Sequence, residues 1–251
     1  MIDSSELSGK IALVTGGARG IGRGIALKLA QAGADLVINY LEREDAAHEV
    51  AEWVRGMGRR VLLAKYDVCD EAQVHAMFES IVAEFGRLDI LVNNVGPFLV
   101  RKVLKMSLGE WRFMMDANLT SAFLVAREAA GLIDRGEQGG AIIFIGAPNA
   151  ERIGSQSESA AYSIAKTGVV ILALTLARDL GGTGIRVNVV NPGYTENDAM
   201  TPRRREWMPH EVPLGRIGTP ANVGDAVLFL VSEQASYVNG EVLNVHGGLW
   251  V

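Results

Sequence analysis

Thr15-Gly16-Gly17-Ala18-Arg19-Gly20-Ile21-Gly22 is the segment most informative about the fold, because it joins a short apolar run to a long amphipathic one. The run before it, Ile11–Val14, has the length and continuous apolar character of a buried strand. The segment after it, Ile21–Gln31, repeats apolar residues at helical spacing. Glycines permit a tight strand-to-helix turn, and the start of the new helix favours a phosphate group. The spacing alone fits a nucleotide site and a plain tight turn equally well.

The same alternation of short apolar runs and longer segments continues along the chain. The longer segments have room for helices that cross from one parallel strand to the next. Runs that are apolar throughout predict a sheet covered on both faces. The pattern predicts an α/β fold, a doubly wound parallel sheet of about seven strands flanked by helices in a three-layer sandwich. The other predicted strands are Leu36–Ile38, Val61–Ala64, Ile90–Val92, Ile142–Ile145, Val187–Val190 and Val242–Val245.

The organisation of the chain predicts one domain, residues 1–251, because no linker-like change of composition divides it. The least regular region, residues 197–213, holds three prolines and the run Arg203-Arg204-Arg205. We expect it to form a lid-like excursion. With 24 Lys and Arg against 29 Asp and Glu, the chain has a net charge of −5, which argues against a nucleic-acid partner.

Metal sites and membrane segments are not expected. The single cysteine, Cys69, cannot form an intramolecular disulfide, and four scattered histidines offer no closely spaced pair of metal ligands. The acidic start of the chain is unlike a secretory or transit signal. The most apolar long segment, Thr167 to Ala177, is too short to span a bilayer. The sequence therefore predicts a cytoplasmic protein without a membrane partner.

Tyr162 and Lys166 form a candidate catalytic pair. They are four positions apart within Ser159–Leu180, which we expect to be helical. This spacing places both side chains on one face of the helix, with an ammonium beside a phenol. A nearby positive charge favours phenolate, so we expect a lowered Tyr162 pKa. A helix-surface Tyr/Lys pair without chemistry is the plain alternative.

From Lys10 to Gly248 these motifs, in this order, resemble the short-chain dehydrogenase/reductase family. The glycine turn matches the family's Thr-Gly-x-x-x-Gly-x-Gly. The other matching segments are Asp67-Val68, Asn93-Asn94-Val95-Gly96, Asn118, Tyr162-x-x-x-Lys166 and Pro192-Gly193. The resemblance implies a Rossmann-type fold and an NAD(P)-dependent oxidoreductase. The tail, with Pro213-Leu214-Gly215-Arg216 and His246-Gly247-Gly248, is most similar to the 3-oxoacyl-acyl-carrier-protein reductases.

The resemblance also implies the catalytic roles. Tyr162 would be the general acid/base, Lys166 would lower its pKa and bind the nicotinamide ribose, and Asn118 would hold a water of the proton relay. The family's catalytic serine is missing. Counting back thirteen positions from Tyr162 gives Asn149, while alignment on the preceding strand gives Ala147.

What replaces the serine stays open. Asn149 is the candidate catalytic residue, since its amide can polarise a carbonyl. Ser155, Ser157 and Ser159 could reach in from the loop, although solvated or helix-capping serines are the plainer interpretation.

The cofactor expected from the resemblance is NADPH rather than NADH. Tyr40 falls where NAD-preferring members carry an acidic residue, and Arg19 could pair with a 2′-phosphate. Glu42 and Asp45 oppose this preference, while Arg43 fits either cofactor. The residues that the resemblance assigns to the cofactor are Gly16, Arg19, Gly20, Ile21, Gly22, Tyr40, Asp67, Val68, Asn93, Gly96, Tyr162, Lys166, Pro192, Gly193 and Thr195.

The expected function is NADPH-dependent reduction of a carbonyl, in a ketone or a 3-oxoacyl thioester, to an alcohol, with Tyr162 as general acid. The alternative, motivated by the missing serine, is a catalytically impaired member that acts as a nucleotide-binding sensor or scaffold. Arg203-Arg204-Arg205 could attract a substrate bound to an acidic carrier protein, or form a solvated helix face. The resemblance implies a homotetramer, and the apolar end Leu249-Trp250-Val251 would suit a contact between subunits.

Overall fold

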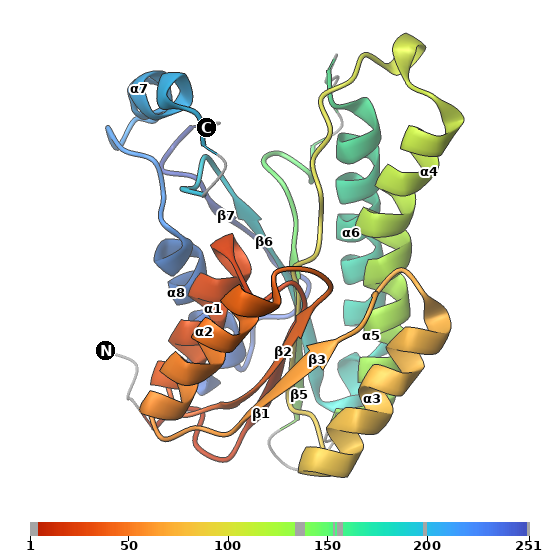
Figure 1. The fold of residues 1–251 in the computed structure, drawn as a ribbon, viewed down its shortest axis with the longest axis vertical. Helices are drawn as coiled ribbons and strands as arrows, with labels where there is room; N and C mark the ends of the chain where they lie inside the picture. Colours follow the sequence, from red (N-terminus) through yellow and green to blue (C-terminus); the bar gives the residue numbers. More distant parts are fainter. Residues whose placement is uncertain (1–4, 134–138, 153, 155–157, 198–199, 250–251) are drawn as a thin grey trace.

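The computed structural model describes residues 5–133, 139–152, 154, 158–197 and 200–249. The strands within these residues form one seven-stranded sheet in the order β3-β2-β1-β4-β5-β6-β7, with every pair parallel (Figure 1). The order reverses between β1 and β4, which confirms the predicted doubly wound sheet. The strands are β1 (Ile11–Val14), β2 (Asp35–Tyr40), β3 (Val61–Lys65), β4 (Ile90–Asn93), β5 (Gly140–Ile145), β6 (Ile185–Pro192) and β7 (Val242–Val245).

Helices cover both faces of the sheet, as predicted for a three-layer sandwich (Figure 1). One layer contains α1 (Gly20–Gln31), α2 (Glu44–Gly56) and α8 (Pro220–Val231). The other contains α3 (Glu71–Phe85), α5 (Ser121–Leu132) and α6 (Ala160–Asp179). Shorter elements connect them: η1 (Val103–Lys105), α4 (Leu108–Met115), the π-helical turn η2 (Asp116–Thr120), η3 (Gly181–Thr183), α7 (Pro202–Glu211) and η4 (Glu233–Ala235).

The strands supply apolar side chains to two separate cores. Leu13 packs in one core with residues of α3, α5 and α6. Its neighbours Ala12 and Val14 pack on the opposite face of the sheet, with residues of α1 and α8. Leu91 and Val92 divide in the same way. Successive side chains of a strand point to opposite faces, so a strand that is covered on both sides must be apolar throughout. This explains the continuous apolar runs in the sequence.

Most predicted elements lie where the pattern placed them, and the differences occur at their ends. The α3 helix begins after its N-cap residue Asp70, whose side chain accepts hydrogen bonds from the backbone N–H groups of Ala72 and Gln73. β2 continues two residues beyond the predicted end at Ile38. The extension includes Asn39, a buried polar residue. Its burial is tolerated because its Nδ2 donates hydrogen bonds to the carbonyl oxygens of Ala64 and Tyr66.

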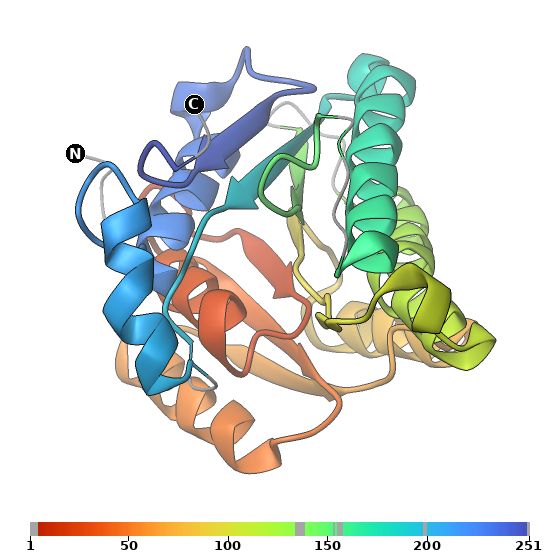
Figure 2. The same ribbon diagram turned by 90° about the horizontal axis from the view of Figure 1, so that it is seen from above.

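The irregular region 197–213 contains the exposed helix α7, which lies across the strand ends from α6 (Figure 2). Thr201 caps this helix by accepting a hydrogen bond from the backbone N–H of Arg204. The ring of Trp207 on α7 makes an edge contact with Tyr194, at 5.6 Å between centroids. Residues 198 and 199 of the expected lid lie outside the described residues.

One helix among the described residues, α6, is long and apolar enough to cross a membrane. It includes the segment from Thr167 to Ala177, which the sequence predicted to be too short to span a bilayer, within a helix of 20 residues. Its residues Val169, Val170 and Ala173 are buried in one of the two cores that flank the sheet. The core helix of a globular domain meets the same criteria of length and hydropathy, and α6 is packed as such a helix.

Candidate active site

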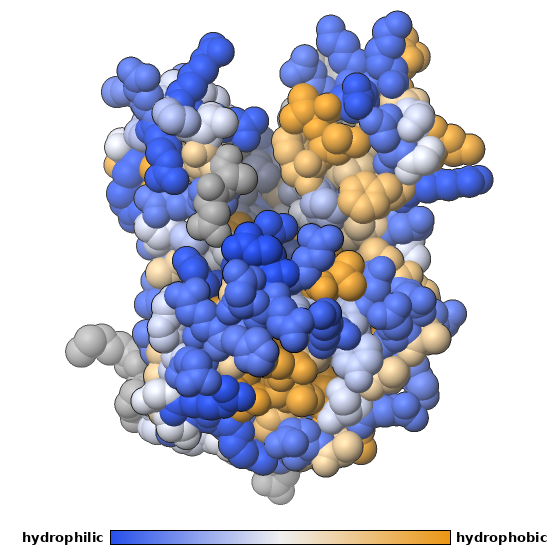
Figure 3. All heavy atoms as spheres, in the orientation of Figure 1, coloured by the Kyte–Doolittle hydropathy of each residue, from blue (hydrophilic) through white to orange (hydrophobic). Residues whose placement is uncertain are grey.

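A cavity of about 700 Å³ opens at the carboxyl-terminal edge of the sheet. Figure 3 shows the molecule hollowed at this edge, between the part that carries α7 and the part that carries α4. The edge includes the point where the strand order reverses, which is where ligands bind in open α/β sheets. The lining residues are Gly16, Arg19, Gly20, Ile21, Gly22, Asn94, Val95, Gly96, Pro97, Phe98, Ile145, Gly146, Ala147, Pro148, Tyr162, Lys166, Pro192, Gly193 and Asn197.

The glycine-rich turn forms one end of the cavity. Gly16 and Gly20 have positive φ angles of 60° and 52°, and a Cβ built on Gly22 would lie 2.3 Å from the carbonyl oxygen of Gly16. These positions therefore require glycine. Among the described residues no side chain caps α1, which leaves the N–H groups of its first turn available to a ligand. Such a turn can hold a pyrophosphate.

Two asparagines outside the predicted site hold this turn in place. Asn94 Nδ2 donates to the carbonyl oxygens of Thr15, at 2.9 Å, and Gly16, at 3.3 Å. The backbone N–H of Gly16 donates to Asn39 Oδ1 at 3.4 Å. The sequence did carry a signal for both residues, since each is a polar residue at the end of an apolar strand.

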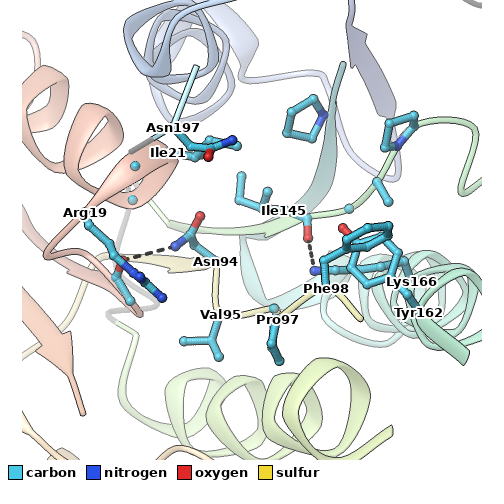
Figure 4. Close-up of a pocket in the computed structure, with 18 of the residues that line it drawn as sticks. Arg19, Ile21, Asn94, Val95, Pro97, Phe98, Ile145, Tyr162, Lys166 and Asn197 are labelled. Atoms are coloured by element: carbon cyan, nitrogen blue, oxygen red, sulfur yellow. Dashed lines mark hydrogen bonds between the residues drawn. The ribbon is translucent and has the colours of Figure 1, made fainter. Parts of the chain in front are cut away.

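The start of α6 forms the other end of the cavity. Tyr162 and Lys166 lie on one face of the helix, as their spacing predicted, and both line the cavity. Lys166 Nζ donates to the carbonyl oxygen of Ile145 at 2.8 Å (Figure 4). The Phe98 ring contacts the Tyr162 ring edge-on, with centroids 4.9 Å apart.

The expected lowering of the Tyr162 pKa is wrong for this structure. Burial raises the pKa of Tyr162 to about 12, and burial lowers the pKa of Lys166 to about 8. Both shifts have the same cause, because removal from water disfavours the charged form of each group. Desolvation is the cause of the Tyr162 shift, with no lowering by Lys166 beside it, and the phenol keeps its proton at neutral pH.

Asn118 lies behind the cavity wall in the π-helical turn η2, a type of turn that is frequent at functional sites. Its Nδ2 donates to the carbonyl oxygens of Pro97, at 3.1 Å, and Met114, at 3.0 Å. Its buried Oδ1 has no hydrogen-bond partner among the described residues. A Cβ built on Gly96 would lie 2.8 Å from this oxygen and 2.7 Å from Lys166 Nζ, so only glycine fits between Asn118 and Lys166.

The two candidate positions for the missing serine differ in place. Ala147 is buried and lines the cavity, whereas Asn149 lies beyond the lining residues in a left-handed conformation with φ of 55°. Ser159 is the N-cap residue of α6 and also lies outside the lining. Ser155 and Ser157 lie outside the described residues.

Several residues assigned to the cofactor lie beyond the cavity lining. Tyr40 is buried in a small apolar cluster with Ala18 and Ala47. Asp67 accepts a hydrogen bond from the backbone N–H of Cys69, and Val68 is buried. The remaining two are tied to backbone carbonyls: Asn93 Nδ2 donates to Ala122, and Thr195 Oγ1 donates to Gly193.

The charges around the cavity favour an anionic ligand. Arg19 at one end and Lys166 at the other contribute cationic groups, and none of the described lining residues is Asp or Glu. A glycine turn, a helix N-terminus and an arginine at one end suit phosphate groups. The phenol and ammonium at the other end suit proton transfer to a bound substrate.

Comparisons with known proteins agree with this arrangement. A family model described as enoyl-(acyl carrier protein) reductase matches residues 16–250. The 3-oxoacyl-acyl-carrier-protein reductase of Escherichia coli K12 is 37% identical over 251 residues, covering 98% of this chain and 99% of that protein.

Two solved structures are similar over nearly the whole chain. One is a short-chain dehydrogenase from Burkholderia cenocepacia J2315 in complex with NADP, with a TM-score of 0.90, 32% identity, and coverage of 97% of this chain and 99% of that one. The other is a blue fluorescent protein from a metagenomic library in complex with NADPH, with a TM-score of 0.90, 33% identity, and coverage of 98% and 100%.

Proposed function

This chain belongs to the short-chain dehydrogenase/reductase family and is an oxidoreductase, and we propose that it uses NADPH to reduce a ketone or a 3-oxoacyl thioester to the alcohol. One observation carries the proposal. The glycine turn at the start of α1 and the Tyr162–Lys166 pair on α6 form opposite ends of one cavity.

The residues present fit a dinucleotide. The close approach of Gly22 to Gly16 leaves the backbone of the turn open to a pyrophosphate, and the uncapped start of α1 supplies N–H donors. Arg19 lines the cavity and would pair with a 2′-phosphate. Buried Tyr40 places no carboxylate there, and two similar proteins bind NADP or NADPH. These points support NADPH over NADH.

The chain's own residues would handle the proton. When held by these residues, NADPH would be the source of the hydride for the carbonyl carbon. The Tyr162 hydroxyl donates its proton to the carbonyl oxygen, which completes the alcohol and leaves a phenolate. Lys166, whose pKa of about 8 keeps it largely protonated at pH 7, stabilises that phenolate. Asn118 Oδ1, buried and without a partner among the described residues, would hold a water that returns a proton to Tyr162.

Carbonyl polarisation without a serine is part of the proposal. The Ala147 methyl group at the cavity wall cannot donate a hydrogen bond. In the described structure Tyr162 is the lining residue with a hydroxyl group. Asn149 would have to turn toward the cavity to serve as the second donor, and we keep it as the candidate for that role.

The assembly, the cellular location and the form of the substrate are proposed from the family resemblance. We propose a single-domain, metal-free homotetramer in the cytoplasm, with α7 as the lid. The arginines at 203, 204 and 205 are exposed on α7, where they would attract a substrate on an acidic carrier protein. The Escherichia coli relative is named for such a substrate. None of the relatives described above is named as a sensor or scaffold, so that alternative gains no support from them.

The test is oxidation of NADPH, and separately of NADH, against a panel of 3-oxoacyl thioesters, diketones, quinones and simple ketones. We expect turnover with NADPH that Tyr162→Phe abolishes while nucleotide binding persists. Full turnover by Tyr162→Phe would refute the assigned role of the phenol. Failure of the unaltered protein to bind either nucleotide would refute the proposed function.

A further inference from the structure

A carboxylate outside the predicted site joins the loop after β5 to the last two strands. Glu151 Oε2 accepts a hydrogen bond from Asn191 Nδ2 at 2.7 Å, and Glu151 Oε1 accepts one from Asn244 Nδ2 at 3.0 Å. The Glu151 side chain is 24% exposed and Asn191 is fully buried. Glu151, Asn191 and Asn244 are called the Glu151 network below.

The sheet brings the two amides to one carboxylate. Asn191 on β6 and Asn244 on β7 are partners in the parallel register, so their side chains lie side by side on adjacent strands. The Oδ1 atoms of both asparagines are buried and have no hydrogen-bond partner among the described residues. Because both side-chain amides donate to Glu151, the carboxylate orients both of them.

The Glu151 network lies directly behind two segments of the cavity wall. Asn191 precedes Pro192 and Gly193, which line the cavity. A Cβ built on Gly146 would lie 2.0 Å from Asn191 Oδ1, so the asparagine packs against the backbone that leads into Ala147. The carbonyl oxygen just before Gly146, that of Ile145, accepts the Lys166 hydrogen bond.

We propose that Glu151 is a positioning residue for catalysis. Its carboxylate fixes the part of the cavity wall formed by Ala147 and Pro148, after β5, relative to the part formed by Pro192 and Gly193, at the end of β6. It thereby also fixes the Ile145 carbonyl oxygen that accepts the hydrogen bond from Lys166. Hydrogen bonds to an ionised carboxylate are about twice as strong as neutral ones, which suits a group that must hold two segments together. The inference rests on the proposed reductase function, because it is turnover that the geometry serves.

The first test compares Glu151→Ala with Glu158→Ala, a matched control that removes an exposed glutamate from the same loop. A wall displaced by about 1 Å can reduce turnover about 100-fold. We expect Glu151→Ala to lower kcat by about 10- to 100-fold. The Kd for NADPH, measured by nucleotide fluorescence, should change less than kcat: Pro192 and Gly193 are assigned to the cofactor, but the glycine turn lies at the far end of the cavity. Glu158→Ala should match the unaltered protein in both.

Two conservative variants separate positioning from general stability. Glu151→Gln should restore part of the turnover, because Asn244 can turn its unpartnered Oδ1 toward the new amide N–H, while the neutral hydrogen bonds are weaker than those to the carboxylate. Asn244→Asp should lower kcat more than Asn244→Ala, because it places a second carboxylate against Glu151. Turnover as poor in Glu151→Gln as in Glu151→Ala would overturn the hydrogen-bonding arrangement proposed here.

A measurement that needs no turnover keeps this proposal distinct from the proposed function. The N–H groups of Ala150 and Arg152 donate to the carbonyl oxygens of Ala147 and Asn149 in the same loop. Their hydrogen exchange should be at least about 10-fold faster in Glu151→Ala and unchanged in Glu158→Ala. Unchanged exchange in Glu151→Ala overturns the proposal, as does faster exchange with wild-type kcat. If the unaltered protein has no turnover, the reductase assignment and the positioning role both fail, while faster exchange would still show that Glu151 holds the loop.

Discussion

Replacement of Lys166 by Met should remove a pH dependence of stability that burial imposes on the protein. Lys166 is 3% exposed, and burial lowers its pKa from 10.5 to about 8. A shift of this size corresponds to about 3 kcal/mol of destabilisation by the buried ammonium at pH 7. Met has a similar length and no charge, so Lys166→Met abolishes this cost while it leaves the Ile145 carbonyl oxygen without its donor, at a cost of about 1–3 kcal/mol.

The sign of the effect follows from proton binding. Between the folded pKa near 8 and the unfolded value of 10.5, the unfolded chain holds the proton more tightly than the folded protein. Stability of the unaltered protein should therefore rise as the pH increases through this window. From pH 7 to pH 9 the gain relative to Lys166→Met should be about 1 kcal/mol.

Urea unfolding of both proteins at pH 7, 8 and 9, without nucleotide, gives the difference directly. Tyr162→Phe is the matched control: the Tyr162 pKa is raised from 10.0 to about 12, so the phenol keeps its proton throughout this range. This control should follow the pH dependence of the unaltered protein. A difference between the unaltered protein and Lys166→Met that stays constant from pH 7 to pH 9 would refute the argument from burial.

Three further substitutions test the site. Gly96→Ala should lower kcat by at least about 10-fold, because its Cβ would lie 2.7 Å from Lys166 Nζ and 2.8 Å from Asn118 Oδ1. The control is Gly131→Ala on α5, whose Cβ would have no atom within 4 Å, and it should keep full activity. Gly22→Ala should weaken NADPH binding at least about 10-fold in a fluorescence titration, because its Cβ would lie 2.3 Å from the Gly16 carbonyl oxygen and distort the turn. An unchanged Kd for NADPH would contradict the role of the turn in cofactor binding. Ala147→Ser places a hydroxyl at the cavity wall and should raise kcat, by up to about 100-fold if the hydroxyl acts as a second donor to the substrate carbonyl. Unaltered turnover would show that another group already holds the substrate carbonyl.

The sheet and the two ends of the cavity could be predicted from residue types and local spacing. Strands covered on both faces need apolar residues at every position, so Ile11–Val14 and the later runs are recognisable as strands from their residue types alone. The glycine spacing in Thr15–Gly22 and the four-residue spacing of Tyr162 and Lys166 are likewise local properties, set by the geometry of a turn and a helix.

The protonation behaviour of the site and its supporting contacts depend on packing between distant segments. The pKa values of Tyr162 and Lys166 depend on how completely the sheet and the neighbouring loop exclude water, and spacing along a helix carries no information about burial. Glu151 is 40 residues from Asn191 and 93 from Asn244, and it meets both because β6 and β7 pair in one register. Such contacts arise from strand pairing between distant segments, and no local periodicity specifies them.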